Sequence, residues 1–539
     1  MSKYASIVGG RKSSVPQSEQ ADPAQVANSA GGFSFQLDQW KRLERFLVLG
    51  SEGGSYYATE KQLTLDNCKV VRECLKTDGV RTVQTILGIS KAGRAPKNDP
   101  AIFALALACR SPDVATAQLA RSAVSQVART GTHLFQFVDA MNTLGGWGRG
   151  AKRAVAGWYL SHDADDLAYQ VVKYQNREKW SHHDVLRLAH VKTDDHTINS
   201  VLSWVTGKVT WGKMTPSAED VLGKLWATDR AKQLDPKDAK QRKELITLVT
   251  EYGLPRECLP TEALNFVDIW EALLVNMPLT AMVRNLGKMS AIGLLAPLSD
   301  ASKKVVTTLH DTEHLRRSRI HPLQLLVAMN VYKQGHGQKG SLSWTPVPQV
   351  ATALESGFYG AFKTIEPSNK RTLLGLDVSA SMNSPELNGL AGITPRVGSA
   401  LMAMVTARTE PEYYFFGFST RFVPINIVAT MPLDQVIRVL NGLPFQGTDC
   451  ALPMTWATAN KIKVDTFHVY TDSETWAGAV HPHIALEVYR QKMGIPAKLV
   501  VVGMTSNGFT IANPNDAGML DVVGFDTHTP SIIADFSRE

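Results

Sequence analysis

The stretch RTLLGLDVSAS, residues 371–381, decides the fold of the C-terminal third of this chain. It begins as a short apolar run and ends with an aspartate and two serines at alternate positions. Similar apolar runs follow at 412–418, 466–471 and 497–502. Helical windows separate these runs, and strand–helix alternation with nearly continuous apolar strands indicates a parallel sheet covered on both faces. We therefore expect an α/β doubly wound domain over residues 365–539.

The strand ends of this predicted sheet carry oxygen donors that fit a cation site. Ligands bind parallel sheets at the carboxyl edge, and there the sequence offers the hydroxyls of Ser379, Ser381 and Thr448. Asp377 and Asp472 end two of the apolar runs and can hold water ligands behind those hydroxyls. Because every donor is a hard oxygen, Mg²⁺ or Mn²⁺ is the expected cofactor. The alternative is a Ser/Asp-rich turn that only caps the next helix.

The neutral hydroxyl ligands have a consequence for binding partners. They leave the charge of the ion largely unbalanced and one coordination position open. A protein partner that donates a carboxylate is therefore expected at this position. No GxSxG, phosphate loop or Cys/His pair stands beside the motif, so we expect no enzymatic activity. His468 and Cys450 are interpreted as buried packing residues.

The first two-thirds of the chain have a helical pattern. Amphipathic windows recur from residue 33 to about 302, and Gly- or Pro-rich breakers separate them. Many amphipathic helices with short turns indicate an α-solenoid, with an irregular helical domain as the alternative. We assign 33–364 to this domain and 1–32 to a flexible arm. The candidate helices are 38–49, 115–129, 133–144, 152–159, 165–175, 181–190, 197–206, 218–228, 241–252, 266–274 and 279–289.

Composition and charge narrow the class of protein. The chain has 539 residues with 57 Lys and Arg against 50 Asp and Glu, a net charge of +7. Residues 361–539 hold 13 basic and 16 acidic residues, so the basic excess lies in the first two-thirds. This asymmetry favours a polyanion-binding part. The five cysteines have no CxxC spacing, and we see no membrane span or signal peptide, which fits an intracellular protein.

Three basic clusters are the candidate nucleic-acid surfaces. They lie at 145–153, at 173–192, where aromatic and histidine residues are interleaved, and at 303–321. Lysine and arginine suit phosphate contacts, and RNA is favoured over duplex DNA because no helix-turn-helix, zinc-finger or basic-zipper pattern is present. A solvated helix face is the alternative for each cluster. Ser181 is the expected N-cap of a helix.

Four stretches carry a resemblance to a known family: residues 31–57, 277–289 (MPLTAMVRNLGKM), 318–328 (SRIHPLQLLVA) and 376–383 (LDVSASMN). Over nearly its whole length the chain resembles the TROVE family of Ro-type RNA-binding ribonucleoproteins. The C-terminal part resembles a von Willebrand factor A domain with its metal-ion-dependent adhesion site, and all five positions of that motif are present.

The resemblance implies HEAT-like helical repeats that close into a ring, bridged by the A domain. It implies binding of small noncoding Y RNAs on an outer basic surface, and of misfolded noncoding RNAs whose single-stranded ends pass through the hole. It further implies a role in RNA quality control and Y RNA stabilisation, in a monomer without membrane contact, located in the cytoplasm or also in the nucleus.

The candidate RNA-binding residues are sorted by this resemblance and by charge. Hole-lining candidates are Arg284, Lys288, Lys303, Arg316 and Arg319. The other candidates, most of them expected on the outer surface, are Arg129, Arg149, Lys152, Arg153, Lys173, Arg177, Lys179, His183, Arg187, His190 and Lys192.

Two other functions compete with this one. A metal-dependent protein-interaction scaffold would act through the A domain and leave the basic helices merely solvated. A Mg²⁺-dependent nuclease is disfavoured, because two-metal nucleases need several convergent carboxylates and this motif is rich in hydroxyls.

Overall fold

A computed structural model describes residues 14–50, 68–177, 179–212, 215–337, 340–362, 365–383, 393–443 and 446–539. The chain divides into two compact units. The α/β unit contains residues 1–70, 94–96 and 362–539, and the helical unit contains 71–93 and 97–361. None of the helices in the described ranges has both the length and the apolar character needed to cross a bilayer.

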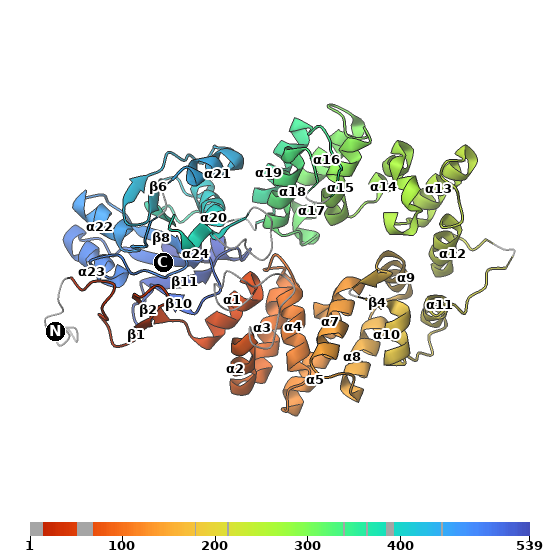
Figure 1. Cartoon of the computed structure of the whole chain (residues 1–539), viewed down its shortest axis with the longest axis horizontal. Helices are drawn as coiled ribbons and strands as arrows, with labels where there is room; N and C mark the ends of the chain where they lie inside the picture. The colour runs from red at the N-terminus through yellow and green to blue at the C-terminus, as the bar shows by residue number, and fades with distance from the viewer. Residues whose placement is uncertain are drawn as a thin grey trace. The chain divides into compact units, whose positions relative to one another are not determined.

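A six-stranded sheet forms the centre of the α/β unit, as the apolar runs predict (Figure 1). Its strand order is β11-β9-β8-β5-β6-β7, and all neighbours are parallel except β6 and β7. The chain leaves β5 to one side and later returns to place β8 on the other, so the topological switch lies between β5 and β8. The strands are β5 Thr372–Asp377, β6 Tyr413–Phe418, β7 Phe422–Pro424, β8 Thr466–Thr471, β9 Lys498–Gly503 and β11 Met519–Val523.

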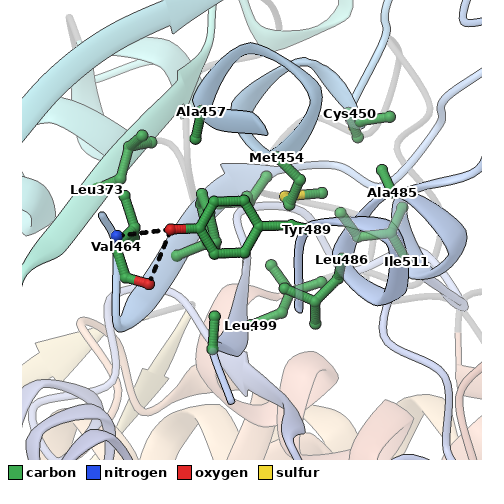
Figure 2. Close-up of a cluster of buried hydrophobic side chains, with 14 of the residues drawn as sticks. Leu373, Cys450, Met454, Ala457, Val464, Ala485, Leu486, Tyr489, Leu499 and Ile511 are labelled. Carbon is green, nitrogen blue, oxygen red and sulfur yellow. Dashed lines mark hydrogen bonds between the residues drawn. The ribbon is translucent and has the colours of Figure 1, made fainter. Parts of the chain in front are cut away.

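Helices cover both faces of this sheet. Helices α22 and α23 pack on one face, where Met454, Leu486 and Tyr489 meet strand residues such as Leu373 and Leu499 in a buried cluster (Figure 2). On the other face α20 lies against β5 and β8, and α24 lies against β11. Because both faces of the sheet are buried, nearly every strand position holds an apolar side chain, which gives the continuous apolar runs in the sequence. These helices are α20 Pro395–Thr409, α21 Leu433–Asn441, α22 Leu452–Ala459, α23 Pro482–Met493 and α24 Thr529–Arg538.

Tyr489 shows how a polar group is accommodated inside this cluster. Its hydroxyl accepts a hydrogen bond from the Val464 amide at 2.6 Å and lies 3.2 Å from the Val464 carbonyl oxygen (Figure 2). It also donates to the Ile462 carbonyl oxygen at 2.8 Å. Because the buried hydroxyl is satisfied, the ring can contribute its apolar area to the core without a desolvation penalty.

The segment before the helical unit differs from the expected flexible arm. Residues 1–13 lie outside the described residues, but Gln25–Ala27 (β1) and Phe33–Gln36 (β2) pair with each other and with Phe509–Thr510 (β10) in a small antiparallel sheet. The polar composition gave no indication of these strands, because they are short and pair with β10, which is far away in the sequence.

Helix α1, Gln39–Leu49, also belongs to the α/β unit and not to the helical domain to which the sequence assigned it. Its Arg45 is fully buried and its guanidinium contacts both carboxylate oxygens of Asp521 in β11, at 2.7 and 3.0 Å. The same guanidinium donates to the carbonyl oxygens of Asn507 and Phe509. A buried charge needs partners of this kind, and these contacts fix α1 on this unit.

The second unit consists almost entirely of helices that pack on helices nearby in the chain, as in α3 on α4, α4 on α7 and α18 on α19 (Figure 1). Closure into a ring stays a prediction. The helices are α2 Lys69–Thr77, α3 Gly79–Ala92, α4 Asp99–Ala108, α5 Val114–Ser122, α6 Val124–Val127, α7 Gly131–Thr143, α8 Arg149–Leu160, α9 Ala164–Lys173, α10 His182–Ala189, α11 His196–Val205, α12 Val221–Ala231, α13 Ala239–Tyr252, α14 Val267–Val275, α15 Leu279–Ala291, α16 Asp300–His310, α17 Thr312–Arg317, α18 Pro322–Gln334 and α19 Pro348–Gly360.

Aspartates start many of these helices. The carboxylates that accept hydrogen bonds from backbone amides of the first turn are Asp78, Asp113, Asp163, Asp195, Asp220, Asp238 and Asp311. Such N-caps satisfy amides that have no partner within the helix. A carboxylate used in this way is directed at the backbone of its own helix.

Two stretches singled out in the sequence are each divided between two helices. The window 115–129 contains α5 and α6, which meet at Ala123. The basic stretch 303–321 spans α16 and α17, with Asp311 between them as C-cap of one and N-cap of the other. The expected N-cap at Ser181 is confirmed: its hydroxyl accepts from the Asp184 amide, and the two residues form a capping box at the start of α10.

Candidate functional sites

The predicted cation-site residues lie at the switch between β5 and β8. Asp377 is the last residue of β5, and Asp472 follows β8 directly. The side chains of Asp377, Ser379, Thr448 and Asp472 are buried, and Ser381 is half-buried. The topology therefore brings the two aspartates, 95 positions apart in sequence, to one edge of the sheet, as expected for a doubly wound fold.

Hydrogen bonds order the first part of the site. The Ser379 amide donates to Asp377 Oδ1 at 2.9 Å, and the Ser379 and Ser381 hydroxyl oxygens lie 3.2 Å apart. Thr471 donates to Asp377 Oδ2 at 2.6 Å, and Ser381 hydrogen-bonds to Asp472. Two hydroxyls and two carboxylates thus form one connected cluster. Asp377-x-Ser-x-Ser has the convergence that its alternate spacing predicts.

Backbone hydrogen bonds link Thr448 to the loop after Asp472. Its carbonyl oxygen accepts hydrogen bonds from the amides of Trp476 at 3.1 Å and Ala477 at 3.0 Å. The Glu474 amide donates to Asp472 Oδ1 at 3.0 Å. The position of Thr448 relative to Asp472 is therefore set by the backbone of residues 472–477, the cation-site loop.

The electrostatics of the cluster fit a bound cation. Burial and the neighbouring charge of Asp472 raise the pKa of Asp377 to about 7, and burial also raises the pKa of Asp472. Two buried carboxylates that oppose each other's ionisation carry negative charge that a divalent ion would offset. The donor set therefore fits Mg²⁺ or Mn²⁺, which would supply an open coordination position to an acidic oxygen. The described residues contain no cluster of three His, Cys, Asp or Glu with metal-binding geometry.

Two residues beside the cluster have the buried packing role expected of them. Cys450 is fully buried, and burial raises the pKa of its thiol. His468 is buried within β8 and its Nε2 lies 3.3 Å from the Ser537 hydroxyl, while burial lowers the pKa of the imidazole to about 3.

Two of the three basic clusters adjoin in the helical unit. Helix α8 packs on α7 and α10, and the hairpin of β3 (Asn176–Arg177) and β4 (Trp180–Ser181) lies against α7. The rings of Trp147 and Trp180 contact each other with centroids 6.3 Å apart. We call the result the basic face; it consists of Arg149, Lys152, Arg153, Arg177, Lys179, His183, Arg187, His190 and Lys192.

The basic face is available to a polyanion. All its side chains are exposed except Lys152, which is half-buried. Within the described part of the chain, Arg149, Lys152, Arg153, Lys179 and Lys192 form no ion pair. The nearby Asp163, Asp184 and Asp195 carboxylates accept hydrogen bonds from backbone amides at helix N-termini. Asp184 also lies 4.0 Å from the His183 imidazole of the basic face.

Several other candidates have partners within the fold. Arg129 donates to the carbonyl oxygen of Ser90 at 2.5 Å, and burial with the nearby charge of Arg319 lowers its pKa to about 10. This contact joins α3 to the end of α6, so Arg129 has a packing role that the sequence did not reveal. Lys303 pairs with Asp300 at 3.0 Å and Arg316 with Glu313 at 3.5 Å, and Lys288 donates to Asn265 at 3.0 Å.

Lys173 and Arg284, expected on separate surfaces, lie near each other. The Lys173 ammonium donates to the Tyr169 hydroxyl at 2.7 Å. Burial lowers the pKa of Lys173, with Glu257 opposing this effect and Arg284 and Arg256 adding to it. Tyr169, Lys173, Arg256 and Glu257 line one pocket. The assignment of Lys173 to the outer surface and of Arg284 to the hole stays a prediction.

Comparison with known proteins matches both units. A model of the TROVE domain matches residues 26–252 and 251–330, and a model of the Ro60 vWA domain matches residues 371–537. The chain is 42% identical over 525 residues to the RNA-binding protein RO60 of Deinococcus radiodurans, covering 97% of each. It is 35% identical over 600 residues to the RNA-binding protein RO60 of Caenorhabditis elegans, covering 98% of this chain and 93% of that one.

A solved structure shows the same likeness. The crystal structure of the Deinococcus radiodurans RO (RSR) protein matches with a TM-score of 0.68 and 41% identity. The match covers 93% of this chain and 99% of the other.

Proposed function

Because this chain belongs to the TROVE family, with a C-terminal vWA domain of the Ro60 type, we propose that it is a non-enzymatic RNA-binding protein whose basic face binds structured noncoding RNA. Its relatives of 42% and 35% identity are named as RNA-binding proteins and match nearly the whole chain. The observation that carries the proposal is the basic face, whose exposed arginines and lysines come from neighbouring elements: α8, the β3–β4 hairpin and α10. Permanent cations on one surface release counterions from a phosphate backbone when they bind it.

The RNA ligands of the proposal are small Y RNAs and misfolded noncoding RNAs, handled in the cytoplasm as part of RNA quality control. A helical stem presents phosphates at regular spacing to the basic face, and unpaired bases can stack on aromatic side chains such as Tyr174 or Trp180. A protein bound over a stem would shield that RNA from nucleases, which is how binding alone would stabilise a Y RNA.

Crosslinking in the native host, followed by sequencing of the attached RNA, tests this proposal. Small structured noncoding RNAs should be enriched, and the crosslinked peptides should come from residues 145–192. Recovery of coding RNA without structural preference, or crosslinks confined to other segments, would contradict it. A pull-down of the protein with and without prior nuclease treatment separates the two kinds of partner. Partners held through RNA are lost after nuclease, and directly bound proteins remain.

The α/β unit supports a second proposed activity: binding of Mg²⁺ or Mn²⁺ by the cation site, with an acidic group of a protein partner completing the shell. The connected cluster of Ser379, Ser381, Asp377 and Asp472 supports it. A scaffold that acts only through this unit is the alternative function. Loss of partner binding on chelation, with RNA binding unchanged, would show that the two activities are separate.

A further inference from the structure

Gln17 is a fully buried side chain from the N-terminal segment that lies among the loops of the cation site. Its Nε2 donates to Asp449 Oδ1 at 2.7 Å and to the Val480 carbonyl oxygen at 2.8 Å. Its Oε1 accepts hydrogen bonds from the Gly478 amide at 3.1 Å and from the Thr475 hydroxyl. Every donor and acceptor of this amide group is thus used, which fixes both its position and its orientation.

The atoms that Gln17 binds belong to the two loops that carry Thr448 and Asp472. Asp449 is the neighbour of Thr448 in sequence. Thr475 lies in the cation-site loop, whose Trp476 and Ala477 amides hold the Thr448 carbonyl oxygen. One amide group therefore connects both loops to each other and to the N-terminal segment, without contacting any residue of the cation site.

The cation-site loop has a conformation that needs support from outside. Ser473, directly after Asp472, has φ of +63°, in the left-handed region that non-glycine residues rarely adopt. Its carbonyl oxygen accepts a hydrogen bond from the Ser34 hydroxyl at 2.8 Å. Asn28 Nδ2 donates to the Thr475 carbonyl oxygen at 2.8 Å. Such conformations persist where the surroundings specify them, and here the N-terminal segment supplies those surroundings.

We propose that residues 16–34 form a strap that sets the relative positions of Thr448 and Asp472, and that Gln17 is its positioning residue. The inference rests on the cation site proposed above. Ligand geometry at a metal site depends on the hydrogen bonds behind the ligands, and removing such a partner commonly weakens metal affinity by about 10- to 100-fold. The strap makes the cation site a product of both ends of the chain.

The test compares Mn²⁺ binding to the full-length protein and its variants, by titration with electron paramagnetic resonance of the free ion. Gln17→Ala should weaken Mn²⁺ binding by about tenfold or more. Gln17→Glu, which keeps the shape but places a carboxylate against Asp449, should weaken it too. The matched control is Gln20→Ala, because the Gln20 amide donates only to carbonyl oxygens of the strap itself, at Pro23 and Gln25. The Mn²⁺ affinity of Gln20→Ala should stay within about twofold of that of the wild type.

A second variant displaces the strap without altering Gln17. A Cβ at Gly32 would lie 2.0 Å from the Thr475 carbonyl oxygen, so Gly32→Ala cannot fit unless the strap or the loop moves. It should weaken Mn²⁺ binding in the same direction as Gln17→Ala. Thermal unfolding of each variant shows whether the α/β unit remains folded at the temperature of the titration.

A measurement on metal-free protein separates this inference from the cation site. Amide hydrogen exchange at Trp476, Ala477 and Gly478 should become faster in Gln17→Ala and stay unchanged in Gln20→Ala. Wild-type exchange rates and wild-type Mn²⁺ affinity in Gln17→Ala would overturn the positioning role. Failure of the wild type to bind Mn²⁺ would overturn the cation site. Faster exchange in Gln17→Ala would then mean that Gln17 only holds a loop, which also overturns its positioning role.

Discussion

The indole rings of Trp147 and Trp180 lie 6.3 Å apart between centroids and join the loop before α8 to the β3–β4 hairpin. Trp180 Nε1 also donates to Asp139 Oδ1 at 3.2 Å. This contact makes one surface of two basic segments that are separate in sequence. An aromatic pair of this kind contributes about 0.5–1.5 kcal/mol beyond its buried area.

Trp180→Ala should therefore weaken RNA binding by about three- to tenfold, the range that this pair energy covers. Because no cation is removed, the slope of log affinity against log salt should stay as in the wild type. Filter binding of a structured small RNA over a salt series measures both quantities. A changed slope with unchanged affinity at low salt would contradict the assigned role of the tryptophan pair.

Substitution of Arg187, His190 and Lys192 together by glutamine should change the salt slope of RNA binding, which Trp180→Ala leaves unchanged. Two permanent charges are lost, so the salt slope should fall by about one to two units and affinity at low salt by about tenfold or more. The control is Lys303→Gln with Arg316→Gln, whose cations already pair with Asp300 and Glu313 and should matter less. Wild-type binding by the triple variant would show that the basic face is misassigned.

Asp377→Ala should abolish tight Mn²⁺ binding and leave RNA affinity within about twofold of the wild type. The reason is that Asp377 contacts Ser379 and Thr471 in the α/β unit, whereas the basic face belongs to the helical unit. Calorimetric titration with Mn²⁺ and filter binding with RNA measure the two activities on one preparation. Equal loss of both would mean that Asp377 supports the fold on which RNA binding depends.

Arg45→Met should destabilise the α/β unit by about 3–5 kcal/mol, because Asp521 would remain buried and unpaired. Asp521→Leu added to this variant should restore part of the loss. The control is Arg438→Met, whose exposed pair with Asp434 at 3.2 Å is worth about 0–1 kcal/mol. Urea unfolding measures each free energy. Equal effects of Arg45→Met and Arg438→Met would refute the buried-pair argument.

The buried imidazole of His182 should make the helical unit less stable at acidic pH. Its Nδ1 lies 2.8 Å from the Tyr159 hydroxyl, and burial lowers the pKa of the imidazole to about 3. Below a pH of about 6.5 the unfolded chain binds a proton that the folded chain does not, so the free energy of unfolding falls as pH falls. Between pH 7.5 and 5, the free energy of unfolding should fall by about 2 kcal/mol less in His182→Asn than in the wild type. Equal pH dependence of variant and wild type in urea unfolding would contradict this.

The sheet and the cation-site residues were predictable because their physics is local. A strand buried on both faces must be apolar at nearly every position, as in 372–377 and 466–471, and strand ends of a doubly wound sheet meet at one edge. Many helix windows were predictable for the same reason, although several helices, α4 among them, were not predicted. Helix α4 is buried on nearly all sides and has no amphipathic pattern to detect.

The strap, the packing role of Arg129 and the approach of Lys173 to Arg284 were not predictable in this way. Each depends on a partner far along the chain. Gln17 lies in a polar segment, and nothing in that segment's sequence indicates that its side chain is buried. The short strands β1 and β2 acquire their structure from β10, so no periodicity within residues 14–36 could indicate them.

The pairing of β2 with β10, and of Arg45 with Asp521 476 positions later, has a consequence for synthesis of the protein. The segment that holds β2 and Arg45 leaves the ribosome long before its partners at residues 509–521 are made. At about 5–20 residues per second this interval is roughly 25–95 s. During that time the helical unit, which lies between them in the chain, can fold on its own contacts. A ribosome that stalls before residue 509 therefore releases a chain whose N-terminal strands and buried arginine have nowhere to dock, and such products are natural substrates for chaperones and proteases.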